Sequence, residues 1–250
     1  MSTSVISTAS RGIGLEFAKH ILEKDVSNNV IALCRSSSAQ LSELESIFKS
    51  RLTIIDNFHL DKQDTIHAAA ERIGKSCDSI DLLVNSAGML GDNTQSRPGP
   101  ERSISGIDRD WLVRTMDTNL IGHIMLTKEL IPLLRKSGRE STIVNISARV
   151  GSIDDNKLGG WYSYRMSKAA LNMFTKTLSV ELKRYKCRVI SIHPGTTDTE
   201  LSIPFQKNVN PDKLFTTSHS VSQMYGNVIQ KITLADTGKF FAYDGSEIPY

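Results

Sequence analysis

Short apolar runs alternate with longer helix-like stretches along almost the whole chain. The runs that favour strands lie near residues 3–6, 30–34, 52–56, 82–85, 142–146, 188–192 and 239–241. The stretches that favour helices lie near residues 12–23, 39–50, 64–75, 108–135, 162–183 and 221–232. This alternation predicts an α/β fold: a doubly wound, mainly parallel sheet of about seven strands, with right-handed crossovers and helices on both faces.

The length of 250 residues fits a single α/β domain, and we expect one domain over residues 1–250. Two segments interrupt the alternation, residues 89–107 and residues 196–213, and both carry prolines. Each follows the carboxyl end of an expected strand, where open α/β sheets bind their ligands. We therefore expect these two segments to form walls of a substrate site.

Composition and charge argue against several classes of protein. The net charge is only +3, and no basic cluster is interleaved with aromatic residues, so a nucleic-acid partner is not expected. The three cysteines are widely spaced, and the histidines lack a zinc-type spacing, so we expect neither disulfides nor a metal. The chain has no signal-like N-terminus and no apolar run of ~18 residues, which favours a cytoplasmic protein without a membrane partner.

The first expected strand runs directly into STASRGIG, residues 7–14, and then into a helix. Glycines near a helix start let the backbone approach a pyrophosphate, and the free N–H groups with the helix dipole favour negative charge. A strand–helix turn without a ligand is the alternative for this fragment alone. The residues that we expect to contact a cofactor here are Ser7, Ser10, Arg11, Gly12, Ile13 and Gly14.

The same stretch resembles the TGxxxGxG cofactor loop of the short-chain dehydrogenases/reductases. Further motifs follow in family order over about residues 3–200: Asp61, NSAG at 85–88, Asn119, YRMSK at 164–168 and HPG at 193–195. A lone YxxxK is a weak signal, whereas this ordered set is a strong one. The runs at 147–153 and 241–249 look most similar to the C-factor/sniffer-type branch, which includes carbonyl reductases.

The resemblance implies an oxidoreductase that uses a nicotinamide cofactor. It implies that Asp61 lies in the adenine pocket and that Asn119 holds a water relaying protons to the lysine. It also adds Asn85, Ala87, Gly88, Pro194 and Gly195 to the cofactor-binding residues. Many relatives pair their subunits through the two long helices, so it implies a homodimer or homotetramer.

Tyr164 and Lys168 have a chemical logic of their own. Residues four apart on a helix share one face, so both side chains can meet one ligand. A phenol of pKa ~10 is a poor acid–base group near neutral pH unless a nearby cation stabilises its phenolate. We therefore expect Tyr164 to be the proton donor and Lys168 to lower its pKa, and the resemblance implies that Lys168 also holds the nicotinamide ribose.

Charge at the end of the second expected strand bears on the choice of cofactor. NAD sites usually place an acidic residue about 20 residues after the glycine turn, on the ribose 2′-hydroxyl. Cys34 occupies that place here, followed by Arg35. Because guanidinium groups bind phosphate well, Arg35 together with Arg11 favours NADP(H) over NAD(H).

Two positions depart from the family pattern. Thr8 stands where the family usually has its first loop glycine, and a β-branched residue crowds that turn. The catalytic serine usually lies three residues before a glycine, and counting back from Gly151 gives Ala148. Ser147 is our choice for the hydroxyl that polarises the carbonyl, while Ser152, or no serine at all, remains open.

The sequence thus predicts an NADP(H)-dependent oxidoreductase of the carbonyl reductase type, acting on a small-molecule carbonyl or alcohol. The alternative is a nucleotide-binding regulatory protein with weak or no turnover, which Thr8 and Ala148 motivate. An adaptor that binds no nucleotide would leave the ordered motifs unexplained. The identity of the substrate does not follow from the fold.

Overall fold

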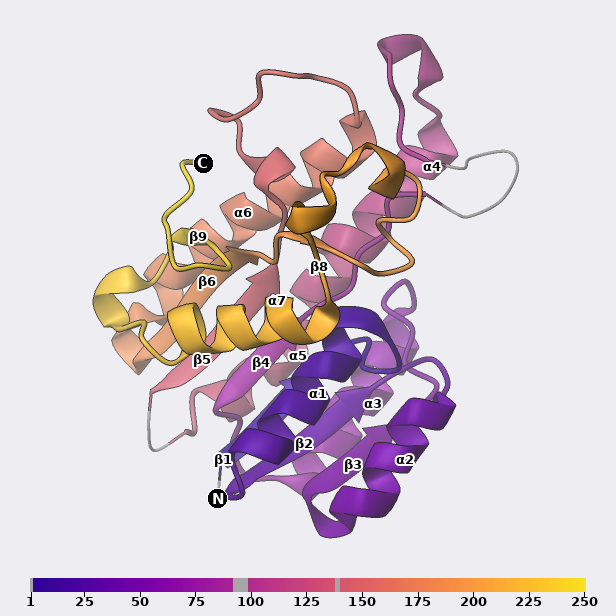
Figure 1. Cartoon of the computed structure of the whole chain (residues 1–250). Helices are drawn as coiled ribbons and strands as arrows, with labels where there is room; N and C mark the ends of the chain where they lie inside the picture. The colour runs from indigo at the N-terminus through magenta and orange to yellow at the C-terminus, as the bar shows by residue number, and fades with distance from the viewer. Residues whose placement is uncertain (1, 92–98, 138–139) are drawn as a thin grey trace.

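The structure is a computed structural model that describes residues 2–91, 99–137 and 140–250. Its centre is a seven-stranded parallel sheet in the order β3-β2-β1-β4-β5-β6-β9 (Figure 1). The strands are β1 Ser2–Ile6, β2 Asn28–Leu33, β3 Leu52–Ile55, β4 Leu82–Asn85, β5 Ser141–Ile146, β6 Cys187–His193 and β9 Phe240–Ala242. The expected doubly wound α/β fold is confirmed.

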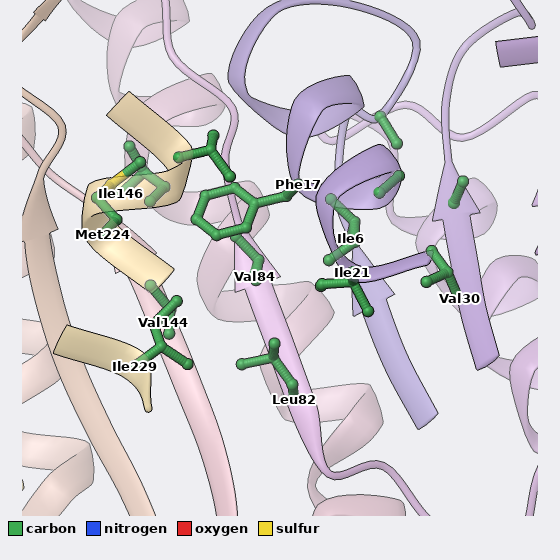
Figure 2. Packing of buried hydrophobic residues seen from close by; sticks show 14 of the residues in the cluster. Ile6, Phe17, Ile21, Val30, Leu82, Val84, Val144, Ile146, Met224 and Ile229 are labelled. Atoms are coloured by element: carbon green, nitrogen blue, oxygen red, sulfur yellow. The ribbon is translucent and has the colours of Figure 1, made fainter. Parts of the chain in front are cut away.

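Helices cover both faces of the sheet. The helices are α1 Gly12–Lys24, α2 Ala39–Phe48, α3 Gln63–Ser76, α4 Arg109–Met116, α5 Gly122–Leu134, α6 Tyr162–Leu182 and α7 Thr217–Gln223. Apolar residues of α1, α2 and α7 pack on one face, and those of α3, α5 and α6 pack on the other. Figure 2 shows Phe17 and Ile21 of α1 beside Val84 and Ile6 of the sheet.

Burial on both faces explains why the strands read as continuous apolar runs. Val5 packs into the core on one face and Ile6 into the core on the other, and neither is exposed to solvent. A parallel sheet between two helical layers has no polar face. Burial of this kind is the main term that stabilises the fold.

Two helices differ from the sequence-based expectation. The expected helix 108–135 contains a π-helical segment, Asp117–Ile121, between α4 and α5. The expected helix 221–232 begins earlier, at Thr217, because the Thr216 hydroxyl accepts a hydrogen bond from the His219 N–H. It then continues into a second π-helical segment, Met224–Ile229. Such widened turns are common beside functional sites.

The two expected wall segments lie at the carboxyl edge of the sheet. Segment 196–213 is more ordered than a loop, because β7 Thr196–Thr197 pairs in parallel with β8 Leu214–Phe215. Part of segment 89–107, residues 92–98, lies outside the described residues. Among the described residues, no helix is both long enough and apolar enough to span a membrane.

Candidate active site

Two adjoining cavities open along the carboxyl edge of the sheet. The larger has a volume of about 1150 Å³ and runs along the loop after β1. The smaller has a volume of about 350 Å³ and lies over the ends of β5 and β6. The wall residues that the two cavities share are Ile13, Ser86, Ala87, Gly88, Leu90, Thr199 and Leu201. This arrangement suits an extended ligand in the larger cavity whose end reaches the smaller one.

The glycine loop between β1 and α1 has the geometry that a phosphate needs. Gly12 has a φ of +56°, which favours glycine. A Cβ atom on Gly14 would lie 2.6 Å from the Thr8 carbonyl oxygen, so a side chain there would force the loop apart. The side chain of the N-cap residue, Arg11, does not cap α1, so the first N–H groups of the helix are available to an anion. The loop therefore fits the pyrophosphate of a dinucleotide.

The structure brings most of the expected cofactor residues to the cavities. Those on the larger cavity are Ser10, Arg11, Gly12, Ile13, Gly14, Arg35, Asp61, Ala87 and Gly88. Those on the smaller cavity are Tyr164, Lys168, Pro194 and Gly195. Residues from six separate parts of the chain thus meet in one cleft, which supports the expected cofactor site.

Ser7 and Asn85 lie beneath the cleft and not on its wall, contrary to our expectation of direct contact. Both are fully buried. The Ser7 hydroxyl accepts a 3.0 Å hydrogen bond from the Ser86 N–H. The Asn85 amide donates to Asn145 Oδ1 at 2.8 Å and to Thr127 Oγ1 at 3.1 Å. Their side chains hold the ends of β1 and β4 in place because their polar groups are committed to neighbouring strands and helices.

Thr8 adopts the left-handed backbone conformation that the family's glycine would adopt more easily. Its φ is +53°. Its hydroxyl compensates in part, donating a 2.8 Å hydrogen bond to the Ser7 carbonyl and lying 3.0 Å from Ser86 Oγ. The side chain lines the larger cavity, so it takes space beside the cofactor loop.

Tyr164 and Lys168 are both buried on the inner face of α6, and both line the smaller cavity. Tyr164 is 7% exposed and Lys168 is 2% exposed. Lys168 Nζ donates a 2.9 Å hydrogen bond to the Ile146 carbonyl, at the end of β5. Burial raises the pKa of Tyr164 and lowers the pKa of Lys168 to about 7. Without a bound nucleotide, burial thus opposes the expected lowering of the tyrosine pKa by Lys168.

Asn119 lies in the π-helical segment and is fully buried. Its Oδ1 accepts from the Met89 N–H at 2.8 Å, and its Nδ2 donates to the Met89 carbonyl at 3.0 Å. Nδ2 also donates to Ser167 Oγ at 3.0 Å. The side chain therefore ties the strand-end segment after β4 to α6, and the expected proton-relaying water stays a prediction.

The structure separates the two candidate serines. Ser147 lines the smaller cavity together with Ala148, and its buried hydroxyl has no hydrogen-bond partner among the described residues. The Ser152 hydroxyl instead accepts a 3.1 Å hydrogen bond from the Asp155 N–H, and Ser152 is not among the residues that line the smaller cavity. A buried hydroxyl without a partner is costly, and rotation of the Ser147 side chain towards the cavity would let a ligand oxygen satisfy it. This geometry favours Ser147 over Ser152.

An apolar wall faces Tyr164 that the sequence motifs did not reveal. Trp161 makes an edge-on contact with Tyr164 at 6.3 Å between ring centres, and Phe205 lies 5.1 Å from Trp161. Leu90 and Leu201 pack into the same cluster. The aromatic residues lie outside the family motifs, and their separation in sequence gave no signal of this contact.

Glu101 is a second residue that sequence reasoning missed. It is 6% exposed, and both its carboxylate oxygens accept hydrogen bonds from Ser163, one from the hydroxyl and one from the N–H. Its carbonyl accepts from the Trp161 N–H at 2.6 Å. Because α6 has no side-chain cap at its first position, Glu101 satisfies the free donors of the helix that carries Tyr164.

Comparison with known proteins agrees with this geometry. The family described as short chain dehydrogenase matches residues 2–210. The chain belongs to this family. It is 31% identical to C-signal of Myxococcus xanthus over 171 residues, which cover 68% of this chain and 93% of that protein. Members of the family are oxidoreductases that use a nicotinamide cofactor.

Two solved structures are similar over the full length. The NADPH-bound carbonyl reductase from chicken fatty liver has a TM-score of 0.86 and 27% identity, covering 100% of this chain and 99% of that one. The carbonyl reductase Sniffer of Drosophila melanogaster has a TM-score of 0.85 and 28% identity, covering 100% of both chains. The expected C-factor/sniffer-type branch of the short-chain dehydrogenases, with its carbonyl reductases, is confirmed.

Proposed function

We propose that this short-chain dehydrogenase is an NADP(H)-dependent carbonyl reductase. The observation that carries the proposal is the place of Tyr164 and Lys168: both are buried, both lie on one face of α6, and both line the smaller cavity, which shares wall residues with the larger one. The NADPH named in the chicken carbonyl reductase structure supports the choice of cofactor.

The chemistry would be carried by three side chains of this protein, Tyr164, Ser147 and Lys168. A bound nicotinamide would supply the hydride that reduces the carbonyl carbon. As the C=O electrons move to oxygen, the Tyr164 hydroxyl donates its proton there, which is favourable because an alkoxide is more basic than even a buried phenolate. Ser147 Oγ donates a hydrogen bond to the same oxygen. The product is an alcohol, and Tyr164 is left needing a proton.

We propose that Lys168 returns that proton. Its pKa of about 7 lets it exchange a proton near neutral pH. Asn119 holds Met89 and Ser167 in position around this pair, and we propose that a water near the widened turn at Asn119 completes the relay. Arg11 and Arg35 would bind the 2′-phosphate, since no carboxylate stands at Cys34 to select a 2′-hydroxyl.

We also propose how the chain is organised and assembled. We propose that residues 1–250 form one domain and that the protein acts in the cytoplasm, where its three free cysteines would stay reduced.

An exposed apolar stripe runs along α6 with a spacing of seven residues. It consists of Met166, Met173 and Val180, which are 40%, 66% and 73% exposed. Such a stripe supports a homodimer or homotetramer. Analytical ultracentrifugation should show the dimer or tetramer, and Met173→Lys should shift the protein towards monomer.

The test of the activity is NADPH oxidation with a panel of aldehydes, ketones and quinones. We expect turnover by the wild type and a fall of about 10²–10⁴ in Tyr164→Phe. Tyr162→Phe is a matched control, because it removes the same hydroxyl two residues away. Turnover that survives in Tyr164→Phe would remove the proposed role of the tyrosine.

A nucleotide-binding regulatory protein is the second candidate, and Ala148 and Thr8 favour it. Ala148 lacks the hydroxyl that family members place there, and Thr8 crowds the cofactor loop. Micromolar binding of NADPH, with no turnover of any carbonyl in the panel, would support this candidate over the reductase. Failure of NADPH and NADH alike to raise the melting temperature would count against both.

A further inference from the structure

Arg11 in the cofactor loop forms an ion pair across the larger cavity. Its Nη1 lies 2.6 Å from Oε2 of Glu200, which belongs to the segment after β6. Both residues line the cavity. The cofactor loop and the segment after β6 also approach each other at the neighbouring residues, where a Cβ atom on Gly12 would lie 3.6 Å from Thr199 Cγ2. The ion pair therefore joins the two sides of the cleft.

The segment that carries Glu200 is held in shape by its own hydrogen bonds. Ser202 Oγ donates to the Thr197 carbonyl at 2.8 Å and accepts from the Thr199 N–H at 3.2 Å. Gln206 Nε2 donates to Asp198 Oδ1 at 2.8 Å. Glu200 is thus presented to Arg11 by an organised turn, which lowers the entropy cost of pairing two long side chains.

The guanidinium of Arg11 is one of the two that a 2′-phosphate would use. A carboxylate and a phosphate bind the same N–H groups of arginine. While Glu200 holds Arg11, the Nη1 group is already engaged, and a 2′-phosphate that uses this group must displace the carboxylate. A nucleotide with a free 2′-hydroxyl has no need to do so.

We propose that Glu200 is a cofactor-selectivity residue, which occupies Arg11 in the nucleotide-free protein and competes with the 2′-phosphate of NADP(H). The inference rests on the proposed NADP(H) function. Glu200 then weakens the binding of NADP(H) and leaves the binding of NAD(H) unchanged. The side chains of Arg11 and Glu200 are 61% and 55% exposed, so solvent screens the pair and the effect is modest.

The test compares Glu200→Gln with the wild type by calorimetric titration at fixed ionic strength. Glutamine keeps the size of the side chain and removes its charge. We expect NADPH to bind roughly two- to fivefold more tightly to the variant, with NADH unchanged. The fragments 2′,5′-ADP and 5′-AMP, which carry no nicotinamide, should show the same contrast. An unchanged dissociation constant for NADPH and 2′,5′-ADP overturns the inference.

Two further variants separate competition from general charge effects. Glu16→Gln removes another carboxylate that lines the same cavity, and it should tighten NADPH less than Glu200→Gln does. In an Arg11→Ala background, Glu200→Gln should have no effect on NADPH. Equal tightening by Glu16→Gln, or tightening that persists without Arg11, contradicts the competition. If the wild type binds NADPH and Glu200→Gln does not change the dissociation constant, the inference about Glu200 fails but the proposed function stands. If the wild type binds neither NADPH nor NADH, both the inference and the proposed function fail.

Discussion

Lys168 lies one helical turn from Tyr164, with its Nζ 5.8 Å from the centre of the tyrosine ring. The ammonium group is anchored to the Ile146 carbonyl at 2.9 Å. Burial gives Lys168 a pKa of about 7 and raises the pKa of Tyr164. The pair therefore favours a protonated phenol beside an amine that exchanges protons near neutral pH.

The first prediction concerns the pH dependence of the reduction. If the protonated form of Lys168 resupplies Tyr164 after each reduction, kcat should fall as pH rises through about 7, approaching tenfold per unit. Lys168→Met, which cannot carry the proton, should lose about 10²–10⁴ in kcat and lose this pH dependence. Initial rates measured across the neutral range test both points. A wild-type profile that stays flat well above neutrality would contradict the role.

The second prediction concerns the carbonyl-polarising hydroxyl. Ser147→Ala should lower kcat by about 10²–10³, because it removes the hydroxyl that we propose as the donor to the carbonyl oxygen. Ser152→Ala is the matched control and should leave kcat near the wild-type value, since that hydroxyl caps the Asp155 N–H. The loss of the cap should cost only about 1 kcal/mol of stability. A larger loss of kcat in Ser152→Ala than in Ser147→Ala would reverse the assignment.

Ala148→Ser extends this test, because it restores a hydroxyl at the position where family members carry one. Ala148 lines the smaller cavity beside Ser147 and packs against Tyr164. In the Ser147→Ala background, Ala148→Ser should recover at least part of the lost kcat. Steady-state rates of the single and double variants measure the rescue. No recovery would mean that a hydroxyl at residue 148 does not reach the substrate oxygen.

Ordered local motifs made the fold and the cofactor cleft predictable from the sequence. The strand–helix alternation gave the sheet, and the glycine loop, Tyr164 and Lys168 lie where their motifs place them. Asn119 could be expected in a buried helix, but neither the π-helical turn nor the contact of Asn119 with Met89, 30 residues away, could be expected from the local sequence.

Long-range contacts explain most of what the sequence did not show. Glu101 caps α6 from 62 residues away, and Trp161 and Phe205 meet only once the segment after β6 folds over the site. The choice between Ser147 and Ser152 depended on which hydroxyl was already engaged by the backbone. Spacing along the chain carries no information about such pairings.

The third prediction concerns the crowded cofactor loop. Thr8→Gly relieves about 1–3 kcal/mol of left-handed backbone strain. It also removes hydrogen bonds to Ser7 and Ser86, at about 1 kcal/mol, and adds glycine's entropy cost of roughly 0.5–1 kcal/mol. These terms nearly cancel, so the melting temperature should change little. NADPH should bind about fivefold more tightly, because the side chain no longer occupies the cavity.

Thr8→Ser provides the control for that experiment. Serine keeps the hydroxyl that bonds to Ser7 and loses only the methyl group, so it should tighten NADPH less than glycine does. Titrations of both variants, with the melting temperature measured alongside, separate crowding from stability. Weaker binding of NADPH by Thr8→Gly would show that the threonine hydroxyl contributes more to the loop than its bulk costs.

The last prediction concerns acid stability and His123, which is fully buried on α5. Its Nε2 lies 3.1 Å from the Ala87 carbonyl, and burial, helped by Lys168, lowers its pKa from 6.5 to about 3. The unfolded chain therefore binds one more proton than the folded protein between these values. His123 contributes its full stability above pH 6.5 and loses it as pH falls towards about 3, at roughly 1 kcal/mol per pH unit.

Chemical denaturation at several pH values tests this dependence. We expect that His123→Gln, which cannot titrate, flattens the slope of the unfolding free energy against pH. The same change at the exposed His219 should leave the slope as it is in the wild type, and an unaltered slope in His123→Gln would contradict the assignment.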